Sequence, residues 1–148
     1  MLILGSLPGA ASLAARRYYA HPANQFWRLV GGVIGRDLAA MPYEHRLAAL
    51  LESGVGLWDT VASARRTGSL DTAIRDAEPA PLADLAATLP NLAAVGFNGG
   101  TSARIGMRQL AQRPHLALVQ LPSSSAAYCR ISFEDKLVQW YSLRKFLR

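Results

Sequence analysis

Three segments of the 148-residue chain concentrate side chains that could do chemistry. Residues 5–12 read GSLPGAAS, residues 18–27 read YYAHPANQFW, and residues 121–128 read LPSSSAAY. Their amide, hydroxyl and phenol groups can hydrogen-bond a polar ligand or hold a water molecule. The glycine-rich turn is neither the dinucleotide fingerprint nor a P-loop, because Gly-x-Gly-x-x-Gly and Gly-Lys-Ser/Thr are both missing. Kinase and Rossmann dehydrogenase functions are therefore excluded.

The elements that must position these segments are short apolar runs. Four such runs end at a Gly, Asp, Asn or Pro signal, and they cover residues 2–4, 55–58, 92–97 and 116–121. Continuous hydrophobicity is typical of parallel strands that are covered on both faces. We therefore predict four buried strands, with Asp59 following the second and Asn98 following the third. In open α/β sheets the functional loops gather at these carboxyl ends.

Amphipathic stretches alternate with the predicted strands. They predict helices over residues 24–34, 43–53, 82–89, 101–111 and 132–146. Asn24 and Ser132 are residue types that commonly cap a helix. The alternation predicts one domain over residues 1–148, a three-layer α/β/α fold around a central four-stranded, mainly parallel sheet. Residues 78–81 are expected to be a connection, and the core is expected to contain Phe26, Trp27, Trp58 and Trp140.

Composition excludes several classes of protein. The apolar runs fall well below the roughly 18 residues of a membrane span, and the opening Met-Leu-Ile-Leu lacks a basic n-region. We therefore expect neither a membrane protein nor a secreted precursor, and a cytoplasmic location. The single cysteine, Cys129, can form no internal disulfide, and 3 histidines give a zinc site little to build on. We expect no metal, and an inert thiol at Cys129.

The charge distribution is uneven. The formal net charge is +6, and residues 1–99 carry equal numbers of basic and acidic side chains. Residues 100–148 hold the whole excess, with Glu134 and Asp135 as their only acids. One basic face for a polyanion such as nucleic acid would explain this asymmetry. A solvated surface in an arginine-rich proteome is the alternative, and charge alone does not decide between them.

Two of the segments together are more specific. Residues 5–9 (GSLPG) and 21–27 (HPANQFW) resemble, in type and spacing, two motifs of the uracil-DNA glycosylase superfamily, in particular its mismatch-specific uracil/thymine branch. The Tyr-Tyr pair before the His-Pro, residues 68–71 (GSLD) and residues 121–125 (LPSSS) are similar to the hypoxanthine-DNA glycosylase branch. The resemblance covers nearly the whole chain. It implies a four-stranded α/β fold, no cofactor, and hydrolysis of the N-glycosidic bond of a damaged base that is flipped out of DNA. Relatives usually carry residues before the first strand, which leaves open a late start or a missing segment.

Two positions depart from the best-known branches. Those branches place Asp or Asn at the third position of the motif at residues 5–9, to hold the attacking water, and often His or Asn at the start of a motif that corresponds to the segment at residue 121. Here the positions are Leu7 and Leu121, whose side chains form no hydrogen bond. The hypoxanthine branch also lacks the first group, and the resemblance implies that Asn24 takes over the polar role. We expect the Asn24 carbonyl oxygen to hold the water; the alternative is that Asn24 only caps its helix.

Five residues are candidates for binding the flipped base: Ser6, Leu7, Tyr19, Asp59 and Asn98. Tyr19 could stack on the base, and the backbone N–H groups of Ser6 and Tyr19 could contact its carbonyls. Asn98 could contact a base edge or buttress the first loop. Asp59 could accept a hydrogen bond from a purine N–H, or form a local turn with Thr60 and Ser63.

The segment after the fourth strand supplies the candidate DNA contacts, which are Ser123, Ser124, Ser125, Tyr128, Arg130 and Lys136. Hydroxyls and free N–H groups can clasp phosphates while a following side chain enters the vacated base stack. The wedge available here is small, which favours bases whose pairing is already weak. An ordinary serine-rich turn is the alternative for the loop. Arg104 and Arg108 are further candidates for phosphate contacts, and a solvated surface charge is the alternative for each cation.

We therefore expect a monofunctional DNA glycosylase in base excision repair, with hypoxanthine as the first substrate and uracil as the second. It should act as a monomer, without a cofactor, on single- or double-stranded DNA that contains a damaged base. A catalytically inactive DNA-binding or damage-sensing module of the same fold is the alternative. A hydrolase of free nucleosides or nucleotides is a further alternative, which the basic last third of the chain disfavours.

Overall fold

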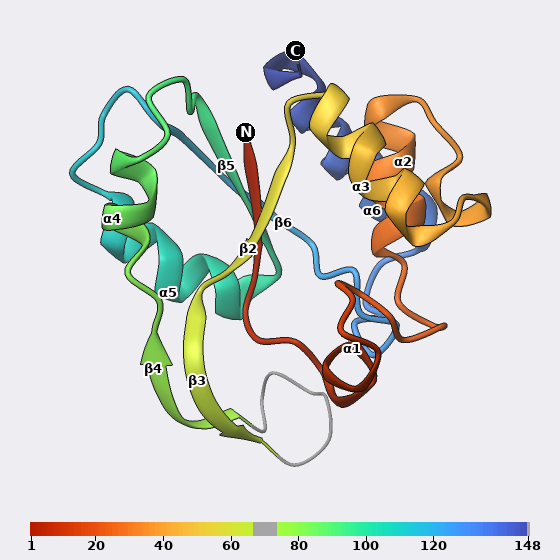
Figure 1. Ribbon diagram of the computed structural model, residues 1–148, viewed down its shortest axis with the longest axis horizontal. Coiled ribbons are helices and arrows are strands. Elements are labelled where there is room, and N and C mark those ends of the chain that lie inside the picture. Colours follow the sequence, from red (N-terminus) through yellow and green to blue (C-terminus); the bar gives the residue numbers. More distant parts are fainter. Residues whose placement is uncertain (67–73, 148) are drawn as a thin grey trace.

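A four-stranded parallel sheet forms the centre of the computed structural model (Figure 1), which describes residues 1–66 and 74–147. Its strand order is β2-β1-β5-β6, and every neighbouring pair is parallel. The strands are β1 (Leu2–Gly5), β2 (Gly56–Asp59), β5 (Ala94–Asn98) and β6 (Ala117–Leu121). All four strands predicted from continuous apolar runs are confirmed. Residues 68–71, whose likeness to the hypoxanthine branch was noted, lie outside the described residues.

Helices cover both faces of this sheet, so the three-layer prediction is confirmed. One face carries α2 (Phe26–Ile34), α3 (Tyr43–Glu52) and α6 (Phe133–Trp140), and the other carries α4 (Leu82–Ala87) and α5 (Gly100–Leu110) (Figure 1). The predicted last helix is an α-helix only to Trp140, and it continues as a 3₁₀ helix over Tyr141–Phe146. A short 3₁₀ helix, Leu38–Ala40, connects α2 to α3.

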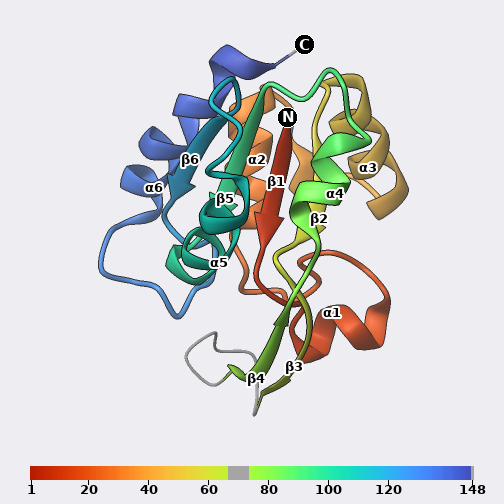
Figure 2. The same ribbon diagram turned by 90° about the vertical axis from the view of Figure 1, so that its left-hand side faces the viewer.

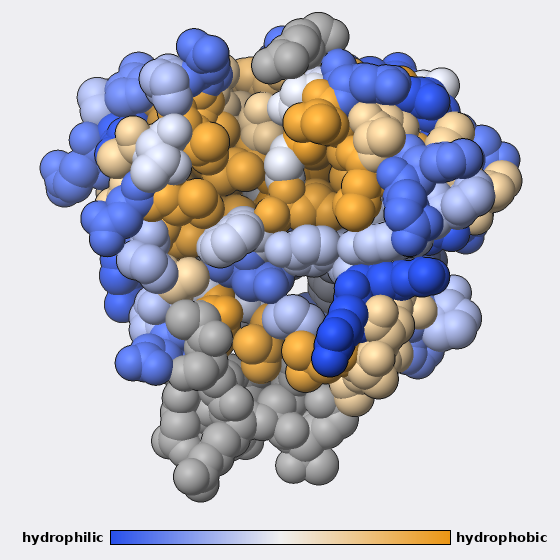
Figure 3. Space-filling view, viewed as in Figure 1, coloured by the Kyte–Doolittle hydropathy of each residue, from blue (hydrophilic) through white to orange (hydrophobic). Residues whose placement is uncertain are grey.

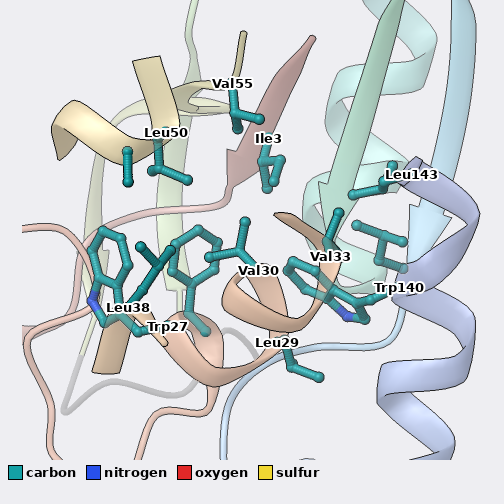
Figure 4. Close-up of a cluster of buried hydrophobic side chains, with 13 residues drawn as sticks. Ile3, Trp27, Leu29, Val30, Val33, Leu38, Leu50, Val55, Trp140 and Leu143 are labelled. Atoms are coloured by element: carbon teal, nitrogen blue, oxygen red, sulfur yellow. The ribbon is translucent and has the colours of Figure 1, made fainter. Parts of the chain in front are cut away.

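The sheet separates two apolar clusters. The larger one lies between the sheet and α2, α3 and α6, and Figure 4 shows Trp27, Val30 and Trp140 within it. The smaller one lies under α4 and α5. Successive side chains of a strand point to opposite faces, so Ile3 of β1 enters the first cluster and Leu4 enters the second. This double burial explains why β1 is apolar at every position.

The prediction of a core position is wrong for Trp58. Its side chain is 48% exposed, whereas Phe26, Trp27 and Trp140 are buried as expected. Trp58 belongs to β2, which pairs only with β1 and forms one edge of the sheet. An apolar strand pattern does not distinguish an edge strand from a central one.

Three elements at the carboxyl edge of the sheet were not predicted from the sequence. These are helix α1 (Ala10–Ala15) and an antiparallel hairpin of β3 (Val61–Arg66) and β4 (Ile74–Pro79). Figure 2 shows all three extending beyond the ends of the parallel strands. The expectation that residues 78–81 form a connection is therefore wrong at its start, because Glu78 and Pro79 end β4. Neither the six residues of α1 nor the polar hairpin has the apolar periodicity on which the predictions depend.

Helix α5 packs closely enough on the sheet to give a testable prediction. A Cβ added at Gly106 would overlap the ring of the buried Phe97 and lie 3.1 Å from Thr60 Cγ2. Replacing a helical glycine by alanine usually stabilises a protein by up to ~1 kcal/mol. We expect Gly106→Ala instead to lower the free energy of unfolding by about 1–3 kcal/mol, because overpacking exceeds that gain. Urea denaturation measures the change. Gly100→Ala on the same helix is the control, since its added Cβ meets only Gln120 Nε2, at 3.9 Å; equal stability changes in the two variants would contradict the prediction.

Candidate active site

A cavity of about 810 Å³ lies at the carboxyl ends of the parallel strands. Its lining includes residues 5–9 of the first loop and residues 123–128 of the loop after β6, and Figure 3 shows the surface hollowed below the body of the domain. Its size is within the range typical of small-molecule sites. Ten of the residues singled out from the sequence line it, namely Ser6, Leu7, Tyr19, Asn24, Asp59, Asn98, Ser123, Ser124, Ser125 and Tyr128. Segments that are far apart in the chain therefore meet at one site, as the parallel-sheet topology requires.

Hydrogen bonds join three of these residues into a directed chain. Asn98 Nδ2 donates to Ser124 Oγ over 2.9 Å, and the Ser124 N–H donates to Asn98 Oδ1 over 2.8 Å. Ser124 Oγ then donates to Asn24 Oδ1 over 2.8 Å. Asn24 Oδ1 also accepts the backbone N–H of Phe26 over 2.9 Å. A backbone N–H can donate to the oxygen of a side-chain amide but not to its NH2 nitrogen, so these contacts orient both amides.

This series of hydrogen bonds corrects the role that was expected of the Asn24 side-chain oxygen. Both lone pairs of Oδ1 are already used, one for Phe26 at the start of α2 and one for Ser124. The oxygen therefore cannot also hold a water, as the sequence analysis expected. Asn24 Nδ2 has no hydrogen-bond partner within the described residues, and Asn24 lines the cavity. The group that Asn24 offers is an N–H donor, which the two bonds at Oδ1 polarise further.

Asn98 lies behind the cavity wall. Its side chain is buried, and both of its polar atoms are bonded to Ser124. It therefore buttresses the loop after β6, rather than the first loop or an edge of the base. The same strand end also receives the backbone N–H of Gly99, which donates to Leu121 O over 3.0 Å. These bonds hold the ends of β5 and β6 together beneath the loop.

The Tyr19 ring is oriented by its backbone and by a neighbouring ring. Tyr19 has φ +52°, in the left-handed region that non-glycine residues adopt at a cost of about 1–3 kcal/mol. Its ring stacks on Phe26, with the ring centroids 3.7 Å apart and the planes at 14°. One face of Tyr19 is thus covered by the core, while the residue lines the cavity. Strained backbone is common at binding sites because the site requires the orientation that it produces.

The placement of Lys136 overturns the expected phosphate contact. Its side chain is only 1% exposed, and its Nζ donates to Gln25 Oε1 over 2.8 Å and to Ser125 O over 3.2 Å. It also lies 5.4 Å from the centroid of the Tyr128 ring. Burial lowers the pKa of the Lys136 ammonium. Lys136 therefore ties the loop after β6 to the start of α2 and does not belong to a DNA-facing surface.

This tie predicts the behaviour of the loop. In Lys136→Met the acceptors Gln25 Oε1 and Ser125 O lose their shared donor, so we expect hydrogen-exchange protection of the Ser124 and Ser125 amides to fall about tenfold or more. Amide exchange followed by NMR measures it. Lys145→Met, at an exposed position near the C-terminus, is the control. Unchanged protection in Lys136→Met would show that the other bonds of the loop suffice to hold it.

Arginines from outside the basic last third also reach the site. Arg16 and Arg17 are exposed and line the mouth of the cavity. Arg130 is exposed as predicted, but it does not line the cavity. Arg16 and Arg17 were not predicted to lie at the site, because only the charge totals of residues 1–99 and 100–148 were compared. The adjacent Arg-Arg just before the Tyr-Tyr pair was the signal available. His21 has a structural role in this loop, since its Nδ1 accepts the N–H of Ala23 over 3.1 Å.

The described part of the chain contains neither a metal-binding cluster nor a helix that could span a membrane. No three His, Cys, Asp or Glu side chains there lie close enough together to hold a metal ion. None of the helices described is both long and apolar enough to cross a membrane. The cavity therefore offers hydrogen-bonding groups, one carboxylate and aromatic surface as its chemical equipment.

Comparisons with known proteins identify relatives of this chain. Two proteins named hypoxanthine DNA glycosylase are similar in sequence. The one from Methanosarcina barkeri is 47% identical over 102 residues, which are 69% of this chain and 65% of that protein. The one from Methanosarcina acetivorans is 39% identical over 140 residues, 95% of this chain and 87% of that protein. The chain thus matches just under two thirds of the length of the first and most of the second.

A solved structure and a family model agree with these relatives. The solution NMR structure of a candidate uracil DNA glycosylase from M. acetivorans matches with a TM-score of 0.84 and 36% sequence identity, over 98% of this chain and 88% of that one. The model of the uracil DNA glycosylase superfamily matches residues 1–143. This match covers both motifs, the whole sheet and every residue that lines the cavity. The chain belongs to the uracil DNA glycosylase superfamily.

Proposed function

We propose that this protein is a monofunctional DNA glycosylase that releases a deaminated base from DNA, hypoxanthine first and uracil second. The similarity to two proteins named hypoxanthine DNA glycosylase supports hypoxanthine as the first substrate. The observation that carries the mechanism is Asn24 Nδ2 at the cavity, which has no partner among the residues that the structure describes. It belongs to an amide held in place by a series of hydrogen bonds. The enzyme acts as a monomer and without a cofactor.

The chemistry requires little more than oriented donors. As the glycosidic bond breaks, positive charge develops on the deoxyribose and negative charge on the departing base. The Asn24 amide donates to the electron-rich base, or to the water beside it, and is held there before the reaction begins. Because the sugar approaches a cation, an ordinary water molecule can attack it. The absence of a polar group at Leu7 is compatible with such a reaction.

Tyr19 and the loop after β6 complete the proposed site. The Tyr19 ring stacks on the flipped base through the face turned away from Phe26, and Phe26 supports the opposite face. Ser123 and Ser125 contact backbone phosphates beside the base, and Tyr128 lies at the edge of the vacated stack. Lys136 takes part only indirectly, by holding this loop.

One assay tests the proposal and separates it from its alternatives. The protein is incubated with duplexes and single strands that contain one hypoxanthine, one uracil or one mismatched thymine, and abasic sites are then cleaved. We expect strand breaks with hypoxanthine and, more slowly, with uracil. Binding to the damaged duplex without base release would indicate the inactive DNA-binding module. Hydrolysis of free deoxyinosine without release from DNA would indicate a nucleoside hydrolase.

A further inference from the structure

Asp59 provides the only carboxylate among the described residues that line the cavity. It ends β2, next to the first loop, and its side chain is half-buried. A Cβ added at Gly5 would lie 2.8 Å from Tyr19 Oη and 3.3 Å from Asp59 Oδ1. The carboxylate and the phenol of the proposed stacking residue therefore converge on the same point. A base stacked on Tyr19 would present its edge within reach of Asp59.

A local structural role does not account for this carboxylate. The N–H groups with which Asp59 could form a turn are used elsewhere, because Thr60 donates to Gly5 O over 2.8 Å and Val61 donates to Ser6 O over 2.9 Å. Within the described residues no side chain donates a hydrogen bond to the Asp59 carboxylate. The Thr60 N–H therefore does not take part in the turn considered from the sequence, and the carboxylate remains available to a ligand.

The other candidate acceptors at this site are already used. Asn98 Oδ1 accepts the N–H of Ser124, and Asn24 Oδ1 accepts two hydrogen bonds. Asn24 Oδ1 therefore has no lone pair left for the base, and Asn98 Oδ1 belongs to a buried side chain and is directed at Ser124. An ionised carboxylate has acceptor positions only and accepts more strongly than a hydroxyl. Asp59 is thus the acceptor best suited to a ring N–H of the flipped base.

Deamination adds a proton at just such a position. In adenine N1 carries a lone pair, whereas in hypoxanthine it carries a hydrogen. In the same way N3 of cytosine is an acceptor and N3 of uracil is a donor. A carboxylate next to this atom gains a charge-assisted hydrogen bond from the deaminated base. With the parent base it faces a second lone pair, and a buried acceptor without a donor is costly.

We propose that the Asp59 carboxylate is the specificity-determining group of this enzyme, which accepts the ring N–H created by deamination and so rejects adenine and cytosine. This inference rests on the proposed function and names the feature that its substrates share. It accounts for one site that accepts both a purine and a pyrimidine. Guanine and thymine carry the same ring N–H, so Asp59 does not discriminate against them. Their exclusion depends on the flipping step, which weakly paired bases undergo more readily.

Burial of the carboxylate supports this assignment. Burial raises the pKa of Asp59 to about 6, so in mildly acidic solution a large fraction of the protein molecules carry a protonated Asp59. The other titratable groups that face it in the described structure are Tyr18 and Tyr19, with Tyr43 behind Tyr18 and Arg16 and Arg17 at the cavity mouth. A protonated carboxyl can donate to adenine N1. Discrimination against adenine should therefore weaken as the pH falls through about 6.

The test compares Asp59→Asn and Asp59→Ala with the wild type in single-turnover release of hypoxanthine, N1-methylhypoxanthine and adenine. We expect the wild type to release hypoxanthine far faster than the N1-methylated base, which has no N–H. Asp59→Ala should slow hypoxanthine release by about 10- to 100-fold, and this variant should release hypoxanthine and N1-methylhypoxanthine at similar rates. Asp84→Asn, which changes an exposed acid on α4, is the control and should leave all rates unchanged.

Thermal unfolding keeps the result interpretable if a variant is inactive. An acid whose pKa is raised in the folded state destabilises that state once it is ionised, so Asp59→Asn should raise the melting temperature at pH 8 and not at pH 4. Lower activity together with higher stability is the signature of a functional group. Hypoxanthine release at the wild-type rate in Asp59→Ala, or lower stability of Asp59→Asn at both pH values, would overturn the inference alone. A wild-type protein that releases no base would overturn the proposed function as well.

Discussion

Replacing Asn24 by alanine is expected to slow base release by about 10² or more. The reason is the loss of a donor that is fixed before the reaction, at the end of the bonds from Ser124 and Phe26. DNA affinity should stay close to that of the wild type, because phosphate contacts provide most of it. Single-turnover kinetics at saturating enzyme measure the effect. An unchanged rate in a folded variant would remove Asn24 from the mechanism.

Asn24→Asp is the matched variant that separates donation from capping. An aspartate keeps the oxygen that accepts from Phe26 and Ser124, so α2 keeps its cap. It lacks the N–H donors and adds a negative charge beside the departing base. We expect it to be folded and as slow as Asn24→Ala. Asn24→Ala also loses the cap, at a cost of about 1 kcal/mol in the free energy of unfolding. Activity of Asn24→Asp near the wild-type level would instead indicate that Asn24 acts through its oxygen.

Affinity for duplex DNA is expected to fall about 50- to 500-fold as salt rises from 50 to 200 mM, which corresponds to about three to five neutralised phosphates. The cations that we expect to make these contacts are Arg16 and Arg17 at the cavity mouth, and Arg104 and Arg130 on the exposed surface. Fluorescence anisotropy over a salt series measures the slope. A flat response would contradict DNA binding by this surface.

Single substitutions assign that slope to residues. Arg17→Ala and Arg130→Ala should each reduce the magnitude of the slope of log K against log salt by about 0.9, equally on damaged and intact DNA. Lys136→Met should leave it unchanged, because the ammonium is buried and bonded to Gln25 and Ser125. Lys145→Ala near the C-terminus is the control. A slope reduced only in Lys136→Met would mean that Lys136 leaves its buried position on binding.

The strands and most helices could be predicted because the spacing of their apolar residues follows the positions that are buried. In β1 both neighbours Ile3 and Leu4 are buried, which produces the continuous run that identified the strand. Helix α1 and the hairpin of β3 and β4 carry no such run, since they extend beyond the sheet (Figure 2). A short and largely exposed helix such as α1 leaves a weak pattern.

Within the site, sequence predicted location better than role. The residues after each strand converge because parallel strands share one carboxyl edge, and that rule needs no side-chain detail. The roles of Asn98 and Lys136 depend on hydrogen bonds across more than ten positions of the chain. Asn98 bonds to Ser124, and Lys136 bonds to Gln25 and Ser125. No local pattern encodes such a partner. A charged residue is expected at the surface, and Lys136 is an exception because neutral acceptors surround its ammonium.

The central position of β1 has a consequence for how the chain acquires its structure. Leu2–Gly5 pairs with β2 on one side and with β5 on the other, and Ser102 Oγ also donates to Leu4 O across most of the chain. Such distant pairings raise the contact order and slow folding. During synthesis, one edge of the apolar β1 can pair only after β2 has been made, from residue 56 onward. The other edge can pair only after β5 has been made, from residue 94 onward. We expect nascent chains shorter than this to be prone to aggregation, because their apolar strand has no partner strand to pair with.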